Sequence, residues 1–174
     1  MSKAFTRESD DSAEDEISSV RTQLPLGARN YITREGVDRL KQRLNGLLQE
    51  KQQLAQKSNE AGIPPETKQR KIETAIRNLQ QILDSVVVAE IPADRERIAF
   101  GANVVIRHGN GEERAYRIVG VEESDPDRDL ISWISPLARA LFSRKAGDRV
   151  LFSSPAGEEE LTILAVSYQA IDKT

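Results

Sequence analysis

Two amphipathic segments joined by a very short link constrain the fold of this chain more than any other feature of its sequence. The first, residues 34–58, places apolar side chains at helical spacings of four, three and seven: Leu40, Leu44, Leu47 and Leu54. The second, residues 66–88, alternates spacings of four and three: Ile72, Ile76, Leu79, Leu83 and Val86. Because the link, residues 59–65, is too short to let the helices separate, the pattern predicts an antiparallel coiled-coil hairpin.

The ends of the two segments carry signals of their own. Thr33 is placed to cap the first helix, and Ile32 before it can pack on Val37. We expect the second helix to continue to residue 88 and Pro92 to stop it.

From residue 101 onward the apolar period falls to two, which is typical of strands. Apolar runs indicate strands near residues 104–106, 115–120, 130–134, 149–152 and 160–167, with a turn at 108–111. Ser135 can cap a short helix that begins at Pro136, and Gly147 is placed to end it. The chain is therefore predicted to be an α+β protein, with a helical hairpin followed by a mostly antiparallel sheet and one short helix.

These patterns divide the chain into four parts: an acidic leader (1–29), the hairpin (30–91), a connector (92–100) and the sheet domain (101–170). The leader has too few apolar groups to offset the entropy of ordering it, so we expect it to be disordered. It either keeps the protein in solution or folds onto a partner, and we favour the first interpretation.

Charge is distributed unevenly along the chain, whose formal net charge is −3. Residues 31–88 hold ten Lys and Arg against seven Asp and Glu, whereas residues 89–174 hold eleven against fifteen. The basic hairpin is either an ordinary solvated helix surface or a surface that lies near phosphates.

Several kinds of chemistry are excluded or disfavoured. The absence of cysteine excludes disulfides, thiolate nucleophiles and cysteine-ligated metals. The single histidine, His108, adjoins a Gly-Asn-Gly turn and is interpreted as a solvated turn residue rather than a catalytic base. Asp125, Asp127 and Asp129 alternate as in a calcium loop but lack the required glycine, so residues 122–129 are interpreted as a solvated acidic connection. We expect no enzymatic activity, no metal site and no cofactor.

The sequence also bears on location. No apolar run approaches the 18 or so residues that span a membrane, and the first residues lack the apolar core of a signal peptide. We therefore expect a cytoplasmic monomer that does not bind membranes.

Specific motifs follow one another in order along the chain. Asn30–Gly36 opens the first helix, and Tyr116–Gly120 precedes the acidic loop. The run Ser135-Pro136-Leu137-Ala138-Arg139-Ala140-Leu141 is followed by a Gly-Asp turn at 147–148. Together these motifs resemble the GreA/GreB family of bacterial transcript-cleavage and elongation factors, and most closely its GreB branch. The likeness covers residues 30–168 except the hairpin tip.

This resemblance implies an FKBP-like sheet domain that docks at the rim of the secondary channel of bacterial RNA polymerase. The coiled coil would pass down that channel, where acidic residues at the family's tip help to hold the second magnesium ion while the polymerase cleaves backtracked RNA. By position in the motif, Ser135, Pro136 and Arg139 are predicted to contact the polymerase. Trp133 and Ile134 beside them either adjust that contact or fill the local core.

The tip departs from the family pattern. Beside Asn59, residues 57–66 offer only Glu60 and Glu66, with no aspartate and no tyrosine. The hairpin is also shorter than the family's by about fourteen residues, which is about seven residues on each arm. At a rise of ~1.5 Å per residue, the tip therefore falls roughly 10 Å short. Because magnesium ligands lie within ~2.1 Å of the ion, side-chain rotamers cannot make up this difference.

Three functions follow, and we favour the first. The chain binds the polymerase channel without stimulating cleavage, and basic residues of the hairpin contact extruded RNA: Lys57, Lys68, Arg70, Lys71 and Arg77. Alternatively, it stimulates cleavage with Glu60 and Glu66 at a rearranged tip. A third possibility is an FKBP-like peptide-binding module, although the domain has few aromatic residues to line such a pocket.

Overall fold

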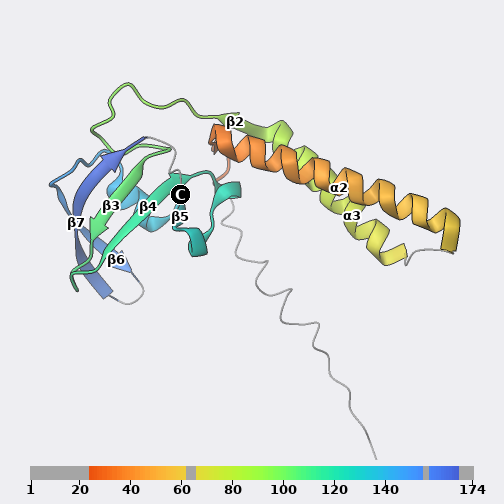
Figure 1. Ribbon diagram of the computed structural model, residues 1–174. Helices are drawn as coiled ribbons and strands as arrows, with labels where there is room; N and C mark the ends of the chain where they lie inside the picture. Colours follow the sequence, from red (N-terminus) through yellow and green to blue (C-terminus); the bar gives the residue numbers. More distant parts are fainter. Residues whose placement is uncertain (1–23, 62–65, 155–156, 169–174) are drawn as a thin grey trace, which may run out of the picture.

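Two long helices project from a small sheet domain in the computed structural model, which describes residues 24–61, 66–154 and 157–168 (Figure 1). Most of the predicted acidic leader therefore lies outside the described residues. Helix α2 (Arg34–Ala61) and helix α3 (Glu66–Ser85) lie side by side, and we call them the helix pair. Leu40 near the start of α2 clusters with Leu79 near the end of α3, and farther along Lys51 forms an ion pair with Glu73 at 3.0 Å, so the two helices run antiparallel. A further ion pair joins Lys68 to Glu50 at 3.2 Å.

The base of the helix pair begins as the sequence predicts. The Thr33 side-chain oxygen accepts a hydrogen bond from the Gly36 backbone N–H at 3.0 Å, which confirms the N-cap. Ile32 is fully buried and forms an apolar cluster with Leu40 and Leu79. Val37 packs against this cluster, so the expected contact around Ile32 is also confirmed.

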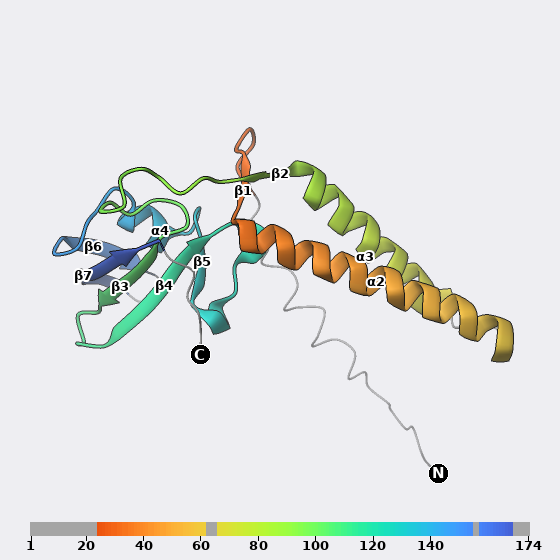
Figure 2. The ribbon, with the colours of Figure 1, turned by 45° about the horizontal axis from the view of Figure 1, so that its top comes forward.

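The predicted end of the second helix is wrong. Helix α3 stops at Ser85, and strand β2 (Val86–Val88) pairs in parallel with strand β1 (Asn30–Ile32). The two strands lie next to each other at the base of the helices in Figure 2. Three consecutive β-branched residues favour an extended backbone, and β1 supplies the hydrogen-bonding partner that a continued helix would leave unpaired. Pro92 lies beyond this strand and ends no helix. Helix α2 extends three residues past the predicted end, to Ala61.

The sheet domain has five strands in the order β5-β4-β3-β7-β6. Every neighbouring pair is antiparallel except β4 with β5, so the predicted mostly antiparallel sheet is confirmed. The strands are β3 (Asn103–Arg107), β4 (Glu113–Val119), β5 (Leu130–Ser132), β6 (Arg149–Ser154) and β7 (Gly157–Ser167). Short helix α4 (Pro136–Leu141) contributes Ala138 and Leu141 to the core of this domain.

Helix α4 begins where the sequence predicts and ends earlier. The Ser135 hydroxyl accepts a hydrogen bond from the Ala138 N–H at 3.2 Å, and Pro136 occupies the first helical position. The helix ends at Leu141, because Phe142 adopts an extended ψ and Ser143 a left-handed φ of 63°. Gly147, with a φ of 91°, instead makes the turn that leads into β6.

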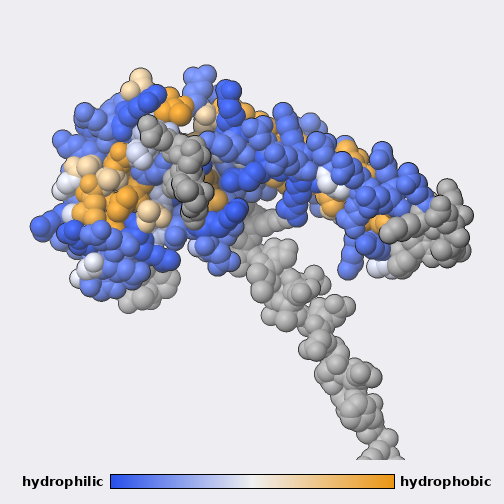
Figure 3. Space-filling model, viewed as in Figure 1, coloured by the Kyte–Doolittle hydropathy of each residue, from blue (hydrophilic) through white to orange (hydrophobic). Residues whose placement is uncertain are grey.

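The connector between the two parts is held to the sheet domain. Ile98 is buried in the core of the domain, and Tyr168 at the end of β7 fixes the backbone on both sides of it. The Tyr168 hydroxyl donates to the Arg97 carbonyl oxygen and accepts from the Ala99 N–H. Figure 3 shows hydrophobic residues gathered over the sheet domain, whereas the helix pair is mostly hydrophilic on the same face.

Candidate functional site

The predicted polymerase-binding residues divide into exposed and buried groups. Pro136 and Arg139 are exposed on α4, so both side chains are available to a partner. The Ser135 hydroxyl is engaged in capping α4. Ile134 is only 6% exposed, which favours the alternative that it fills the local core. Trp133 is half-buried, with its ring edge-on to Tyr31 at a centroid distance of 5.8 Å.

A shallow pocket of about 240 Å³ lies beside Ser135 and adds a concave surface to this face. One wall is Tyr116, with the Arg114 guanidinium 5.7 Å from its ring centroid. Arg114 also forms an ion pair with Asp129 at 3.3 Å, which fixes its position. The face around α4 thus combines exposed cations, an aromatic ring and a concave surface, all features of protein-binding surfaces.

The predicted RNA-contact residues lie mainly on α3. Arg70 and Lys71 line a shallow groove of about 520 Å³ together with Thr67, Thr74, Ala75 and Asn78. Lys71 and Arg77 are exposed. Lys68 is already paired with Glu50, which reduces its availability to a phosphate. The side chain of Lys57 lies outside the described residues.

The tip residues are placed only by their backbone. Asn59 and Glu60 belong to the last turn of α2, and Glu66 is the first residue of α3, but their side chains lie outside the described residues. Within the described residues no group of three or more His, Asp or Glu is arranged to hold a metal ion. Whether Glu60 and Glu66 come together therefore stays a prediction.

The interpretation of His108 as a solvated turn residue is wrong. Its Nδ1 lies 3.1 Å from Oε1 of Glu159 on β7, and its side chain is only 19% exposed. The contact with His108, together with a hydrogen bond from the Gly109 N–H, lowers the pKa of the Glu159 carboxyl below its ordinary value. His108 thus fastens the β3–β4 turn to β7. The two residues are 51 positions apart, so no local pattern reveals the pair.

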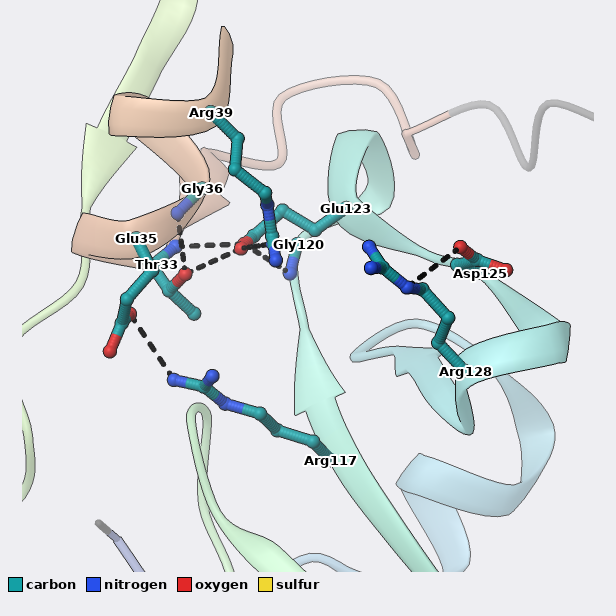
Figure 4. Close-up of polar contacts among 9 residues, drawn as sticks. All are labelled: Thr33, Glu35, Gly36, Arg39, Arg117, Gly120, Glu123, Asp125 and Arg128. Atoms are coloured by element: carbon teal, nitrogen blue, oxygen red, sulfur yellow. Dashed lines mark hydrogen bonds and ion pairs between the residues drawn. The ribbon is translucent and has the colours of Figure 1, made fainter. Parts of the chain in front are cut away.

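The interpretation of residues 122–129 as a solvated connection is also wrong in its first turn. The segment contains two 3₁₀ turns, η1 (Val121–Glu123) and η2 (Pro126–Arg128). Glu123 in η1 is only 7% exposed, and its carboxylate points into the start of α2 (Figure 4). Sequence reasoning missed this residue because its partners lie about 90 positions away.

The Glu123 carboxylate joins the helix pair to the sheet domain. Its Oε2 accepts hydrogen bonds from the Thr33 N–H at 2.8 Å and from the Gly120 N–H at 3.0 Å. Its Oε1 accepts from the Thr33 hydroxyl and from Nη2 of Arg39 at 3.1 Å. We call this arrangement of Thr33, Arg39, Gly120 and Glu123 the junction.

A second ion pair lies beside the junction. Arg117 on β4 contacts Glu35 in the first turn of α2 at 3.2 Å. Burial acts to raise the pKa of the Glu35 carboxyl, but its own backbone N–H and the charge of Arg117 outweigh that effect, so the pKa lies below its ordinary value. Because the Glu35 side chain is 47% exposed, water screens this pair more than it screens Glu123.

No helix within residues 24–61, 66–154 and 157–168 is long and apolar enough to cross a bilayer.

The fold and the junction define a two-part α+β protein in which a helix pair projects from a small sheet domain. Residues 93–168 match the family described as transcription elongation factor GreA/GreB, C-terminal part. Transcription elongation factor GreB of Neisseria meningitidis serogroup A is 36% identical over 158 residues, covering 83% of this chain and 97% of the relative. GreB of Yersinia pestis is 31% identical over 161 residues, covering 85% of this chain and 94% of the relative.

Among solved structures, GreA factor homolog 1 (Gfh1) of Thermus thermophilus is 25% identical and aligns with a TM-score of 0.37, covering 80% of this chain and 99% of that one. The two GreB sequences are similar to this chain over most of its length, and so extend the likeness beyond the matched C-terminal part. This chain belongs to the GreA/GreB family of bacterial transcription elongation factors.

Proposed function

We propose that this protein binds bacterial RNA polymerase at the secondary channel and regulates elongation without stimulating transcript cleavage. The sheet domain docks at the channel rim, and the helix pair enters the channel. The polymerase performs all chemistry on RNA, and this chain contributes no catalytic residue and no metal ligand. It acts as a cytoplasmic monomer. The observation that carries the proposal is the composition and reach of the hairpin tip.

The reach of the helix pair supports this proposal. Helix α2 has 28 residues, which at ~1.5 Å per residue makes an arm of about 42 Å. The match to the Neisseria GreB extends over 158 positions but includes only 83% of the 174 residues here, so about 14 positions of the relative have no counterpart. This difference equals in number the shortening expected for the hairpin, and it describes the aligned chain as a whole.

The charge of the tip supports it as well. Clamping a magnesium ion against a phosphoryl oxygen requires carboxylates that converge on the ion. Between residues 57 and 66 the chain offers only Glu60 and Glu66, and Glu66 stands in the first turn of α3, where the helix dipole favours a negative charge without any ligand role. Two glutamates on a shortened arm are a poor substitute for an acidic tip.

A transcript-cleavage assay on stalled, backtracked polymerase tests the proposal directly. We expect no cleavage above background at saturating protein, beside a cleavage-competent Gre factor as positive control. We also expect this protein to suppress the activity of that factor by competing for the channel. Cleavage that is stimulated by this protein and abolished by combining Glu60→Ala with Glu66→Ala would establish the alternative function at a rearranged tip.

The docking face is tested separately by capture of purified polymerase. Arg139→Glu reverses an exposed charge on α4, so we expect it to weaken binding by tenfold or more, about 1.4 kcal/mol. Arg144→Glu, also exposed in the same domain, is the matched control and should bind as the parent does. Equal binding by both variants would remove α4 from the interface.

Contact with extruded RNA is a finer part of the same proposal. Lys71→Gln with Arg77→Gln removes two exposed charges of α3 and should reduce RNA crosslinking in the polymerase complex. Arg43→Gln, exposed on α2, is the control. Unchanged crosslinking would leave the basic surface as an ordinary solvated helix face. Isomerisation of a proline peptide by the purified protein would instead support the FKBP-like peptide-binding alternative.

A further inference from the structure

The junction buries the Glu123 carboxylate, although nothing in the neighbouring sequence predicts that this side chain is buried. The Glu123 side chain is 2% exposed, and removing a carboxylate from water is costly unless every oxygen is hydrogen-bonded. Each oxygen here accepts two hydrogen bonds, so the carboxylate is saturated. Three of the four donors lie at the start of α2, two on its N-cap Thr33 and one on Arg39, whereas the Gly120 N–H belongs to the sheet domain. The burial of Glu123 is therefore compensated only while the two parts hold one relative position.

The start of α2 gains from the same contact. The first N–H groups of a helix have no partner within the helix, and the positive end of the helix dipole lies there. The Thr33 hydroxyl satisfies the Gly36 N–H, while Glu123 accepts both the Thr33 N–H and the Thr33 hydroxyl. Glu123 thus completes the cap of α2 from outside the helix, as Figure 4 shows.

Two glycines provide the space that this arrangement needs. A Cβ atom added to Gly36 would collide with the Glu123 carboxylate, and one added to Gly120 would collide with the Tyr31 carbonyl oxygen. Neither glycine has a positive φ, so chain conformation does not demand glycine at either position. Close approach of β1 and α2 to η1 explains both, and this approach leaves little room for the helix pair to tilt.

Other contacts that the described residues make between the two parts are less directional. Arg117 and Glu35 form an ion pair with a half-exposed glutamate, and the Tyr31 ring meets Phe100 and Trp133 through apolar surface. Apolar contacts tolerate sliding, whereas four hydrogen bonds to one buried carboxylate do not. A tilt of about 10° at the base of an arm of about 42 Å would displace its far end by about 7 Å.

We propose that Glu123 is the positioning residue that fixes the direction in which the helix pair leaves the sheet domain. Replacing it would leave both parts folded and the apolar contacts in place, but would let the helix pair sample a range of directions. This inference concerns the free protein and does not depend on the function proposed above.

Because the chain contains no cysteine, two introduced cysteines can be labelled specifically and the distance between the two parts measured directly. Gln49→Cys on α2 and Leu151→Cys on β6 are exposed positions that accept spin labels in the full chain, with no competing thiol. Pulsed electron paramagnetic resonance then reports the distribution of distances between the two parts. We expect one narrow distribution with Glu123 present and a distribution at least about twofold wider in Glu123→Ala, because a hinge replaces a fixed junction.

Matched variants distinguish the loss of a fixed helix-pair direction from a general destabilisation of the fold. Asp127→Ala removes an exposed carboxylate from the neighbouring turn η2 and should leave the distribution narrow. Glu123→Gln keeps the size of the side chain but turns an N–H₂ group toward hydrogen-bond donors, so we expect a width between those of parent and Glu123→Ala. Far-UV circular dichroism should show unchanged helix and strand content in every variant.

The width of the distance distribution decides whether Glu123 fixes the direction of the helix pair. A Glu123→Ala protein that is folded and retains the narrow distribution would overturn it. If Glu123→Ala does not fold, Arg39→Gln removes a single, partly exposed donor from the same carboxylate. A wider distribution in Arg39→Gln then supports the proposal, and an unchanged one rejects it.

Discussion

The two ends of the helix pair are stabilised in different ways. At the base, Ile32 is fully buried, Thr33 caps α2, and the Glu123 carboxylate accepts four hydrogen bonds. Farther out, the polar contacts between the helices are surface ion pairs such as that of Lys51 with Glu73, in which the side chains are 45% and 38% exposed. The base depends on specific partners in fixed positions, whereas the outer half depends on a repeating apolar stripe.

The two ends should therefore differ in how much sequence change they tolerate. A stripe of leucines and isoleucines accepts many substitutions of similar volume, and exposed ion pairs contribute little to stability. A saturated buried carboxylate and two glycines in close contact accept almost none. In a protein that presents a tip at the end of a long arm, the outer half is therefore free to change in length and charge while the base keeps the direction of the arm.

The largest effect should come from the core of the base. Ile32→Ala removes a fully buried side chain from the cluster with Leu40 and Leu79, so we expect a loss of about 3–4 kcal/mol in the free energy of unfolding. Leu48→Ala, at a position that is 40% exposed on the outer half, should cost less than about 1 kcal/mol. Urea unfolding followed by circular dichroism measures both, and similar losses would erase the distinction between the two ends.

Two glycine-to-alanine substitutions should change the free energy of unfolding in opposite directions. Gly120→Ala places a methyl group against the Tyr31 carbonyl oxygen, and relieving that overlap should cost about 2 kcal/mol. Gly46→Ala in the middle of α2 meets nothing within 4 Å and should stabilise the protein by about 1 kcal/mol, because alanine is the better helix former. The same urea titration compares them. A neutral Gly120→Ala would mean that β1 and η1 separate easily.

Lowering the pH should weaken the ion pair of Glu35 with Arg117 at the base of the helix pair. A carboxyl whose pKa is lowered by folding stabilises the protein above its unfolded pKa of about 4.3, and this contribution is lost as the pH falls through the folded pKa. Because Glu35 is half-exposed, we expect less than about 1 kcal/mol. Glu35→Gln should therefore flatten the decline of stability below about pH 4.5. An unchanged slope would show that Arg117 does not stabilise the ionised form.

Local signals in the sequence predicted much of the fold. The caps at Thr33 and Ser135 were predicted because a capping side chain bonds a backbone N–H three positions away, inside one short motif. The apolar periods likewise located both long helices and the strands of the sheet domain.

Contacts between distant segments were not predictable in this way. Val86–Val88 continued a helical pattern, yet it forms a strand because β1, more than 50 residues earlier, lies beside it. Glu123 and Glu159 are ordinary members of acidic runs until Thr33 and His108 are brought to them. Tertiary partners at such separations override local propensity, and one sequence contains no pattern that pairs them.

The smallest effect should come from the outer half. Nζ of Lys51 lies 3.0 Å from Oε1 of Glu73, and hydrogen bonding from Lys51 lowers the pKa of the Glu73 carboxyl, but both side chains remain in contact with water. A double-mutant cycle with Lys51→Ala and Glu73→Ala should give a small favourable coupling at low salt that disappears near about 1 M sodium chloride. The same salt change should leave the Glu123 junction intact, because the Glu123 carboxylate is buried and most of its hydrogen bonds come from uncharged donors. A coupling that persists unchanged at high salt would show that the outer half depends on specific polar partners as the base does, and would contradict the tolerance inferred for the outer half.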